Sequence, residues 1–411
     1  MRRQRAVSSS LLRSYVGTVL AAIFACHAAA SAAELPAVIR VGVLSDMSGS
    51  TADSAGQGSV VAARLAAEDV GSAIGASKVE VLAGNSQGKA DLALSIARQW
   101  LDQDSVYAIV DLPYTQVALA VADLGRQRDR AVLVGSATAS DLTGKACNAV
   151  TTHWTDDTYA LAAGTARTLT LAGDKTWFFL TADYAFGLAM QRDATAAIEA
   201  EGGRVVGAVR HPLASPDMSS FVNQAIASQA QIVGLANVGA DTINAIKEAA
   251  AFGLVQNKQK LAGLLVFIND VHAMELETAQ GLLVTSGFYW DRNDASRRFA
   301  DRFRAQVGRP PSKAQAAVYA ATLHWLRAVA QSGSVSGEAT TRAMKSTPAD
   351  YFGQQATIAA NGRVLYDLAI YRVKRPAESK GPWDAYTELA PLPRDQAFRP
   401  ATASECPLTR P

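Results

Sequence analysis

From residue 38 onward, short runs rich in β-branched residues alternate with segments in which apolar residues recur at helical spacing. Residues 38–44 predict a first strand, and Val61, Leu65 and Ala66 lie on one face of the helix that follows. Strands that alternate with helices form parallel sheets covered by helices on both faces. The pattern therefore predicts an α/β fold of doubly wound, Rossmann-like sheets.

The alternation occurs in two series of similar plan, which predicts two lobes. The first series ends near residue 134, and the second opens after His153 and Trp154. Open α/β sheets bind ligands beyond the carboxyl ends of their strands, so we expect the binding site in a cleft between the lobes. The expected strands are 38–44, 79–83, 106–110 and 131–134, then 176–180, 204–209, 231–236, 261–268 and 281–286, with a late strand or hairpin arm at 364–374.

The first 32 residues have the pattern of a secretory signal peptide. Four arginines and no acidic residue occur in this segment, an apolar run covers residues 15–25, and Ala30-Ser31-Ala32 fits a signal-peptidase site. We expect cleavage after residue 32 and a mature protein in the periplasm. An uncleaved anchor and lipidation of Cys26 are the alternatives.

The composition of the chain excludes several classes of protein and of partner. With 49% hydrophobic and 18% charged residues, the chain has a globular composition rather than that of a disordered, collagen-like or coiled-coil protein. The formal charge of +2 becomes −2 without the signal peptide, and no Lys/Arg cluster is present. We therefore expect no nucleic-acid partner. The histidines lack ligand-spaced companions, so we expect no metal.

Cleavage of the signal leaves two cysteines, Cys147 and Cys406. An even pair in an oxidising compartment predicts a disulfide, which would tie the C-terminal tail back to the first third of the chain. Two free buried thiols are the alternative.

The glycine pair Gly56-Gln57-Gly58 lies between a strand and a helix, as in a dinucleotide-binding loop. The third glycine position holds Val61 and the loop is long, whereas a dinucleotide fingerprint needs a tight turn with close backbone approach to the pyrophosphate. The sequence also lacks a Gly-x-Ser-x-Gly elbow and a phosphate loop with Lys. We expect no enzymatic activity and no cofactor.

Four segments carry a resemblance to a known family: residues 41–49, 134–143, 182–187 and 280–285. In their order and spacing the chain resembles the type I periplasmic solute-binding proteins of ABC transporters, in the branch of leucine/isoleucine/valine-binding receptors. The resemblance covers nearly the whole mature chain. It implies a monomer that captures a small-molecule ligand by closing two lobes and interacts with permease and ATPase subunits.

The resemblance also implies three crossovers between the lobes, so that each lobe is discontinuous. The expected lobes are residues 34–153 plus 286–349, and residues 154–285 plus 350–411.

The loop Ser136-Ala137-Thr138 follows a strand and precedes a helical stretch. Hydroxyl groups and backbone N–H groups there favour a ligand carboxylate, and in the family equivalent groups hold the carboxylate of an amino acid. The family adds the loop after the third strand, here with Tyr114 and Thr115. The alternative is that Ser136 and Thr138 cap a helix.

A ligand ammonium needs an acidic or carbonyl partner once it is buried. The family supplies an acid after the strand expected at 261–268, and Asp270 is the candidate here. The alternative is that Asp270 caps a helix. In that case the ligand is an acid without an amine.

Tyr184 and Phe186 match the family's cleft position and are expected to cover an apolar ligand. Met47 and Ser48 lie in the loop after the first strand, and we expect this loop to face the ligand. The favoured ligand is a branched-chain or other apolar amino acid. An aromatic or other organic acid, or a role as a ligand sensor, remains the alternative.

Overall fold

The computed structural model describes residues 35–254 and 258–409. The expected signal peptide and Cys26 lie outside these residues, so cleavage after residue 32 stays a prediction. Among the described residues, no helix has the length and apolar character needed to cross a membrane.

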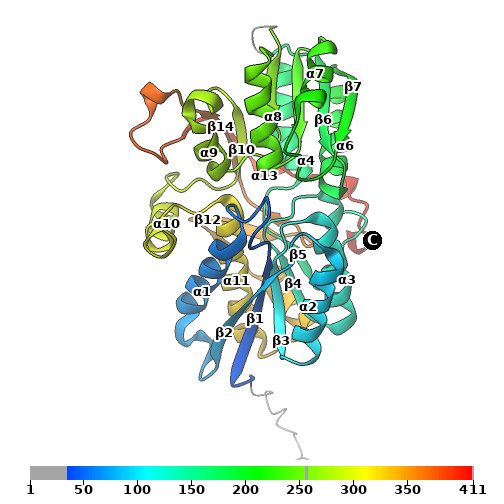
Figure 1. The fold of residues 1–411 in the computed structure, drawn as a ribbon. Helices are drawn as coiled ribbons and strands as arrows, with labels where there is room; N and C mark the ends of the chain where they lie inside the picture. The colour runs from blue at the N-terminus through cyan, green and yellow to red at the C-terminus, as the bar shows by residue number, and fades with distance from the viewer. Residues whose placement is uncertain (1–34, 255–257, 410–411) are drawn as a thin grey trace, which may run out of the picture. The chain divides into compact units, whose positions relative to one another are not determined.

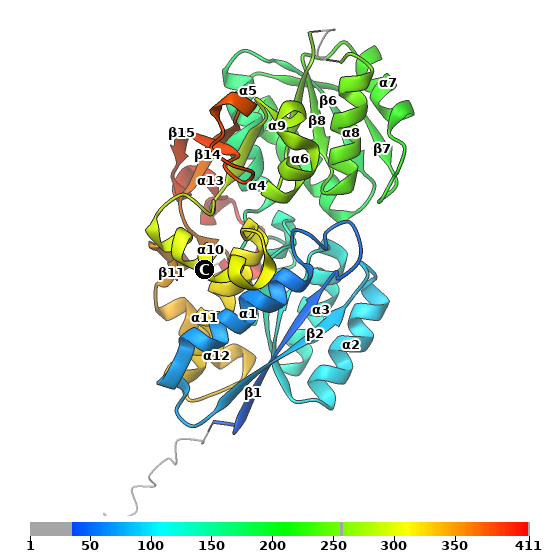
Figure 2. The same cartoon turned by 60° about the vertical axis from the view of Figure 1, so that its left-hand side comes forward.

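The first lobe is built on a parallel sheet with the strand order β2-β1-β3-β4-β5. Successive side chains of a strand point to opposite faces, and both faces are apolar. Helices α1 and α11 cover one face, and α2 and α3 cover the other (Figures 1 and 2). The strands are β1 (Val38–Ser45), β2 (Lys78–Asn85), β3 (Val106–Asp111), β4 (Ala131–Val134) and β5 (Thr151–His153), and the helices are α1 (Gly56–Val70), α2 (Ala90–Asp102), α3 (Thr115–Arg128), α10 (Asp294–Val307), α11 (Lys313–Ser332) and α12 (Gly337–Ser346).

The second lobe repeats this plan in a parallel sheet with the order β7-β6-β8-β9. Helix α6 packs on one face of this sheet, and α7, α8 and α9 pack on the other. The strands are β6 (Thr176–Ala182), β7 (Arg204–His211), β8 (Ile232–Ala236) and β9 (Lys260–Gly263), and the helices are α4 (Thr158–Leu161), α5 (Arg167–Leu171), α6 (Ala185–Ala200), α7 (Ser219–Ala227), α8 (Ala240–Ala251) and α9 (Ile268–Ala279).

In both parallel sheets, the order in which the chain adds strands reverses at an equivalent place. The chain order reverses at β1 and β3 in the first sheet and at β6 and β8 in the second. In doubly wound sheets, ligands bind beyond the carboxyl ends of the strands at this switch point. The loops after these four strands are therefore the ones expected to form a site.

Two small antiparallel sheets complete the fold, with the orders β10-β14-β15 and β11-β12-β13. The first packs with the second lobe, and the second packs with the core formed by α1 and α11. Their strands are β10 (Leu283–Ser286), β11 (Ala349–Tyr351), β12 (Gln354–Ile358), β13 (Val364–Leu365), β14 (Leu368–Val373) and β15 (Tyr386–Leu392), and the short helix α13 (Arg394–Ala397) follows.

Two expectations about strands were wrong. The strand expected at 261–268 ends at Gly263, and Ile268 already begins α9, because the apolar run from 264 to 268 is buried as a loop and a helix start. The strand expected at 281–286 does not extend the second parallel sheet. It pairs antiparallel with β14 as β10.

The position of the lobe boundaries stays a prediction. Tyr351, Phe352, Ile358 and Val364 belong to the same apolar core as α1 and α11, whereas Tyr371 and Tyr386 pack in the core of the second lobe. Side chains shortly after residue 349 thus contact the first lobe, and those of β14 and β15 contact both.

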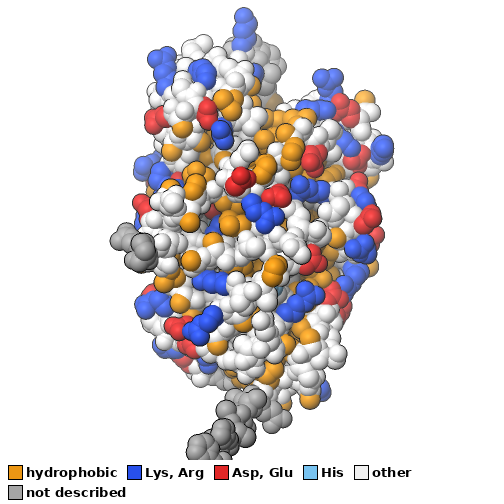
Figure 3. Space-filling view, turned by 180° about the vertical axis from the view of Figure 1, so that it is seen from behind, with side chains coloured by type: hydrophobic (Ala, Val, Ile, Leu, Met, Phe, Trp, Pro, Cys, Tyr) orange, Lys and Arg blue, Asp and Glu red, His pale blue; other side chains and the backbone are white. Residues whose placement is uncertain are grey.

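Charges of both signs are intermixed on the face seen in Figure 3. Many charged side chains of the described residues form exposed ion pairs, such as Arg126 with Asp123 and Arg128 with Asp102. Pairs of this kind stabilise a fold by at most about 1 kcal/mol each.

Candidate functional site

A small cavity of about 20 Å³ lies where loops from the two parallel sheets meet. This volume is about that of one water molecule, so the cavity is a candidate ligand site because of the residues that line it and not because of its size. Its wall contains residues that follow β1, β3, β4, β6, β8 and β9, as the switch points of the sheets predict. The lining residues are Thr51, Ser54, Ala55, Pro113, Thr115, Ser136, Thr138, Tyr184, Phe186, Val238, Leu265, Phe267 and Ala314.

The two sides of the cavity differ in chemistry. The first lobe contributes the hydroxyl side chains of Thr51, Ser54, Thr115, Ser136 and Thr138, whereas the second lobe contributes mainly aromatic and aliphatic side chains. Among the described residues that line the cavity, none is acidic or basic. The cavity therefore presents hydrogen-bonding groups on one side and apolar surface on the other.

The hydroxyl side of the cavity holds unused hydrogen-bonding groups. Thr115 is 1% exposed, and its Oγ1 has no partner among the described residues. Thr115 also begins α3, whose first backbone N–H groups lack intrahelical acceptors and receive no side-chain cap. A helix N-terminus favours negative charge, so this end of the cavity suits an anion such as a carboxylate.

The loop after β4 is only partly free to bind a ligand. The Ser136 N–H donates to Asp111 O, and the Ala137 N–H donates to Leu112 O at 3.1 Å. The Thr138 N–H has no backbone partner among the described residues. Neither Ser136 nor Thr138 caps a helix, because the short helical turn that follows is preceded by Ala139.

A buried carboxyl group shapes the loop after β1. Asp46 is fully buried and accepts hydrogen bonds from the Gly49 N–H at 2.7 Å, from Thr51 Oγ1 at 3.1 Å and from Tyr114 Oη at 2.9 Å. It thereby holds Thr51 in the cavity wall. The Tyr114 ring in turn lies 6.5 Å from the ring of Tyr184 in the other lobe.

Of the residues that the sequence singles out, Thr115, Ser136, Thr138, Tyr184 and Phe186 line the cavity together. Tyr114 lies beside it, hydrogen-bonded to Asp46 and Ser50. Ala137 does not line it, and its carbonyl oxygen lies 2.6 Å from Nε2 of the buried His153. Their contact with a ligand stays a prediction.

Three other candidates lie away from the cavity. Ser48 is exposed, and Met47 packs against the core of the first lobe. Asp270 lies in the first turn of α9, where its Oδ2 accepts a hydrogen bond from the Phe267 N–H at 2.9 Å. Burial raises the pKa of Asp270 to about 7. Its observed contact is that of a helix-capping residue.

The early end of β9 explains why Asp270 lies away from the cavity. The residues directly after this strand are Leu264 and Leu265, and Leu265 lines the cavity. The position after the strand is thus apolar, where the resemblance implies an acid. The sequence analysis missed Thr51, Ser54, Ala55, Val238, Leu265, Phe267 and Ala314. Of these, Val238, Leu265 and Phe267 come shortly after β8 or β9, so the first residues after each strand were the signal that could have found them.

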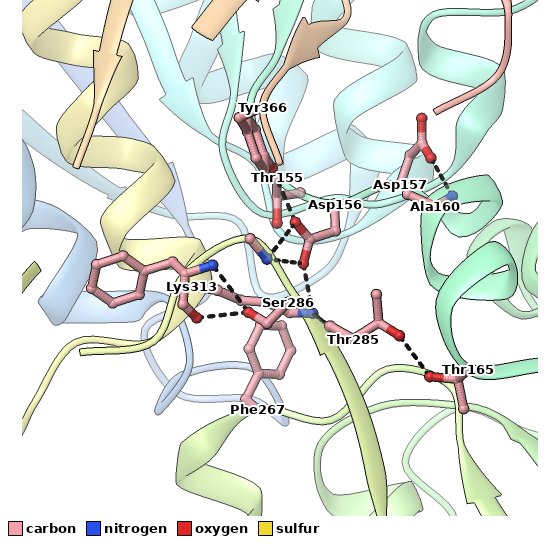
Figure 4. Close-up of polar contacts among 12 residues, drawn as sticks. Thr155, Asp156, Asp157, Ala160, Thr165, Phe267, Thr285, Ser286, Lys313 and Tyr366 are labelled. Atoms are coloured by element: carbon pink, nitrogen blue, oxygen red, sulfur yellow. Dashed lines mark hydrogen bonds and ion pairs between the residues drawn. The ribbon is translucent and has the colours of Figure 1, made fainter. Parts of the chain in front are cut away.

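A cluster of buried polar groups joins the segments that run between the lobes (Figure 4). Lys313 Nζ lies 3.0 Å from Asp156 Oδ2 and donates to the Thr285 carbonyl oxygen at 3.0 Å. Asp156 also accepts hydrogen bonds from the Gly287 N–H at 3.2 Å and from Tyr366 Oη at 3.1 Å. Lys313 begins α11, and the next residue, Ala314, lines the cavity.

The expected disulfide is confirmed: Cys147 and Cys406 are bonded, with their Cα atoms 5.7 Å apart. Among the described residues, no group of three or more His, Cys, Asp or Glu side chains is arranged to hold a metal ion.

Comparisons with known proteins agree with this architecture. A solved periplasmic binding protein from Burkholderia mallei is 41% identical, with 90% of this chain and 99% of that chain covered and a TM-score of 0.88. A branched chain amino acid ABC transporter periplasmic ligand-binding protein from Burkholderia xenovorans is 36% identical, with 90% and 100% covered and a TM-score of 0.81.

A solute-binding protein of an ABC transporter from R. palustris, solved in complex with benzoate, is 18% identical, with 90% and 100% covered and a TM-score of 0.79. At this identity the likeness shows the fold alone. The family model described as periplasmic binding protein matches residues 38–382, which is most of the chain. The resemblance seen in the sequence is thus confirmed, and the chain belongs to the periplasmic binding protein family.

Proposed function

We propose that this chain is the periplasmic receptor of an ABC importer and that it captures a small aromatic or other apolar carboxylic acid that carries no amine. The observation that carries this proposal is the composition of the cavity wall, with hydroxyl groups on one side, apolar groups on the other and no acidic side chain. The receptor acts as a monomer, and its signal peptide is removed on export.

The hydroxyl side supports a carboxylate. A buried carboxylate needs several hydrogen-bond donors, because an unpaired buried charge is costly. Thr115 Oγ1 has no partner among the described residues, the Thr138 N–H has no backbone partner there, and the start of α3 has no side-chain cap. Phe186, Val238 and Leu265 then face the apolar body of the ligand.

The same wall argues against an ammonium group. Leu265 follows β9, where the family resemblance implies an acid, and Asp270 is engaged with the Phe267 N–H. An ammonium in this cavity would lose its hydration without gaining a carboxylate partner.

We propose lobe closure as the mechanism. A ligand that contacts both lobes stabilises the closed arrangement in proportion to its differential affinity for it. Gly239 supports a closed arrangement here, because a Cβ at this position of the second lobe would lie 2.5 Å from the Ser50 carbonyl oxygen of the first. The permease would recognise the closed form, and the ATPase subunits would supply the energy for transport.

A branched-chain amino acid is the second candidate. It is favoured by the 36% identity to the Burkholderia xenovorans protein, which is described as a branched chain amino acid ABC transporter periplasmic ligand-binding protein. Matched ligand pairs separate the two candidates. The purified mature protein is unfolded and refolded to remove bound ligand, then melted with 3-phenylpropionate or phenylalanine, and with isocaproate or leucine.

Ligand at about 1,000 times its dissociation constant stabilises the folded state by about 4 kcal/mol, which gives a clear shift in Tm. We expect shifts with the acids that lack an amine. Shifts only with phenylalanine or leucine would replace this proposal with an amino-acid receptor, and no shift with any carboxylate would reject both.

A further inference from the structure

Asp111 is a buried carboxyl group directly behind the cavity wall. It ends β3 and is 0% exposed, and Ser136, which lines the cavity, donates a hydrogen bond from its hydroxyl to Asp111 Oδ1. The other oxygen, Oδ2, has no partner among the described residues. The Asp111 carbonyl oxygen accepts the N–H groups of Gly135 and Ser136, so β3 and the loop after β4 are held together here.

The backbone at Asp111 is unusual for a residue with a side chain. Asp111 and Leu112 have φ angles of 89° and 62°, in the left-handed region that favours glycine. Two adjacent non-glycine residues in this region cost free energy, and such strain concentrates at functional sites. This backbone conformation lets the Asp111 side chain lie behind Ser136, where it accepts the Ser136 hydroxyl.

Among the described residues, no basic side chain compensates the charge of the Asp111 carboxyl group. β1 contributes the Ser45 hydroxyl and the charge of Asp46 that follows it, and α1 contributes the Ser59 hydroxyl. On α11, Lys313 is held by Asp156 and Thr285. On β5, burial lowers the pKa of His153 well below its usual value, so this histidine is neutral.

These surroundings favour the protonated form of the Asp111 carboxyl group. Burial raises the pKa of Asp111 to about 6, the Asp46 charge adds to this, and the hydroxyls of Ser136, Ser45 and Ser59 act in the opposite direction. A bound carboxylate on the far side of Ser136 would add a second negative charge and raise this pKa further.

A serine hydroxyl has one proton to donate. When Asp111 is ionised, Ser136 donates that proton to Asp111 and turns only lone pairs toward the cavity. When Asp111 is protonated, Asp111 can donate to Ser136 Oγ, and the Ser136 proton is free to point at a ligand.

We propose that binding of a carboxylate ligand is coupled to uptake of one proton by Asp111, which lets Ser136 donate its hydroxyl to the ligand. The proton comes from solvent, and no covalent bond to the ligand forms. This inference rests on the proposed function, since it requires a carboxylate in the cavity. It makes Asp111 a positioning residue that acts through Ser136.

The coupling sets a direction for pH dependence. Below the pKa of Asp111 in the free protein, the acid is already protonated and the affinity is constant. Above it, each unit of pH weakens binding by up to about tenfold, until the pKa of the bound state is reached. A carboxylate ligand itself stays ionised over this range.

The test is calorimetric titration of the full mature protein with 3-phenylpropionate at about pH 7.5, in phosphate and in Tris, whose ionisation enthalpies differ. We expect uptake of more than about half a proton per ligand bound. Asp111→Asn should still bind, because its amide N–H can donate to Ser136 Oγ, but with no proton uptake and a flat pH profile. Asp157→Asn is the matched control. Asp157 is also a buried acid with a raised pKa, but it caps α4 outside the cavity wall, so proton uptake should persist.

Two results would overturn the inference and leave the proposed function intact. One is binding of 3-phenylpropionate without proton uptake, and the other is proton uptake by Asp111→Asn equal to that of the wild type. If Asp111→Asn does not fold, Ser136→Ala serves instead. Loss of the Ser136 hydrogen bond raises the pKa of Asp111 before binding, so proton uptake should fall. Failure of 3-phenylpropionate, benzoate and isocaproate all to bind would reject the proposed function and this inference together.

Discussion

The ammonium nitrogen of Lys313 lies 3.0 Å from the Asp156 carboxylate, and the two side chains are 4% and 1% exposed. Lys313 begins α11, and Asp156 follows β5 in a segment that runs between the lobes. Tyr366 Oη and the Gly287 N–H bind the same carboxylate, so this one group links three such segments.

Replacing Lys313 alone should strongly destabilise the protein, because it leaves the Asp156 charge buried and unpaired. We expect Lys313→Met to lower the free energy of unfolding by about 3–5 kcal/mol in urea titrations. The double variant Lys313→Met/Asp156→Leu should lose less than the sum of the single variants. Arg126→Met, which breaks an exposed pair with Asp123, is the control and should cost less than about 1 kcal/mol. A cost for Lys313→Met as small as that of the control would contradict the prediction.

Thr138 should contribute directly to ligand affinity. We expect Thr138→Ala to weaken binding of 3-phenylpropionate by about 1–3 kcal/mol in calorimetric titrations, because a buried hydrogen bond to a charged group is lost. Thr138→Ser keeps the hydroxyl and should bind within about 1 kcal/mol of the wild type. Unchanged affinity of the alanine variant would remove Thr138 from the site.

Gly239 should be required for the close approach of the two lobes. It has a φ of 62° at the start of α8, and a Cβ there would lie 2.5 Å from the Ser50 carbonyl oxygen. We expect Gly239→Ala to weaken ligand binding at least tenfold. Gly202→Ala is the control, because Gly202 has a φ of 72° but no described neighbour within 4 Å of its Cβ position. The two variants should lose a comparable amount of Tm. Equal ligand affinity in the two variants would show that the Ser50 contact does not matter.

The disulfide should stabilise the fold by closing a long loop. Cys147 and Cys406 are separated by 259 residues, and removal of a disulfide usually costs about 2–5 kcal/mol. We therefore expect Cys147→Ser/Cys406→Ser to melt at a lower temperature than the wild type. Reduction of the wild type should lower its Tm to a similar extent, and detection of two free thiols in the untreated mature protein would refute the bond.

Asp270 should make stability depend on pH. Its pKa is raised from 3.8 to about 7 by burial, so between these values the folded state binds more protons than the unfolded chain. Stability should therefore fall as pH rises from about 4 to 7, and Asp270→Asn should reduce this fall by about 1–3 kcal/mol. The amide oxygen still accepts the Phe267 N–H. Identical pH profiles for the variant and the wild type would show that Asp270 does not titrate in this range.

Much of the site could be predicted because it depends on the order of strands and loops. Thr115, Ser136 and Thr138 follow strands with clear β-branched patterns, so their position at the carboxyl edge of a parallel sheet could be read from the chain. Leu265 and Phe267 could not, because the apolar run 261–268 is equally compatible with a continued strand and with a buried loop. Because the strand was expected to end at residue 268 and not at Gly263, the acidic position expected after it was assigned to Asp270.

The amino-acid sequence by itself determined two α/β lobes, their family and the pairing of the two cysteines, because hydrophobic periodicity, loop composition and an even cysteine count are local or countable properties. Only the tertiary structure decided which side chains share the cavity, that Asp270 caps α9, and that Asp111 lies buried behind Ser136. These relationships join residues from different strands and lobes. They depend on where each strand ends and on which groups lose contact with water, and neither is encoded in local spacing.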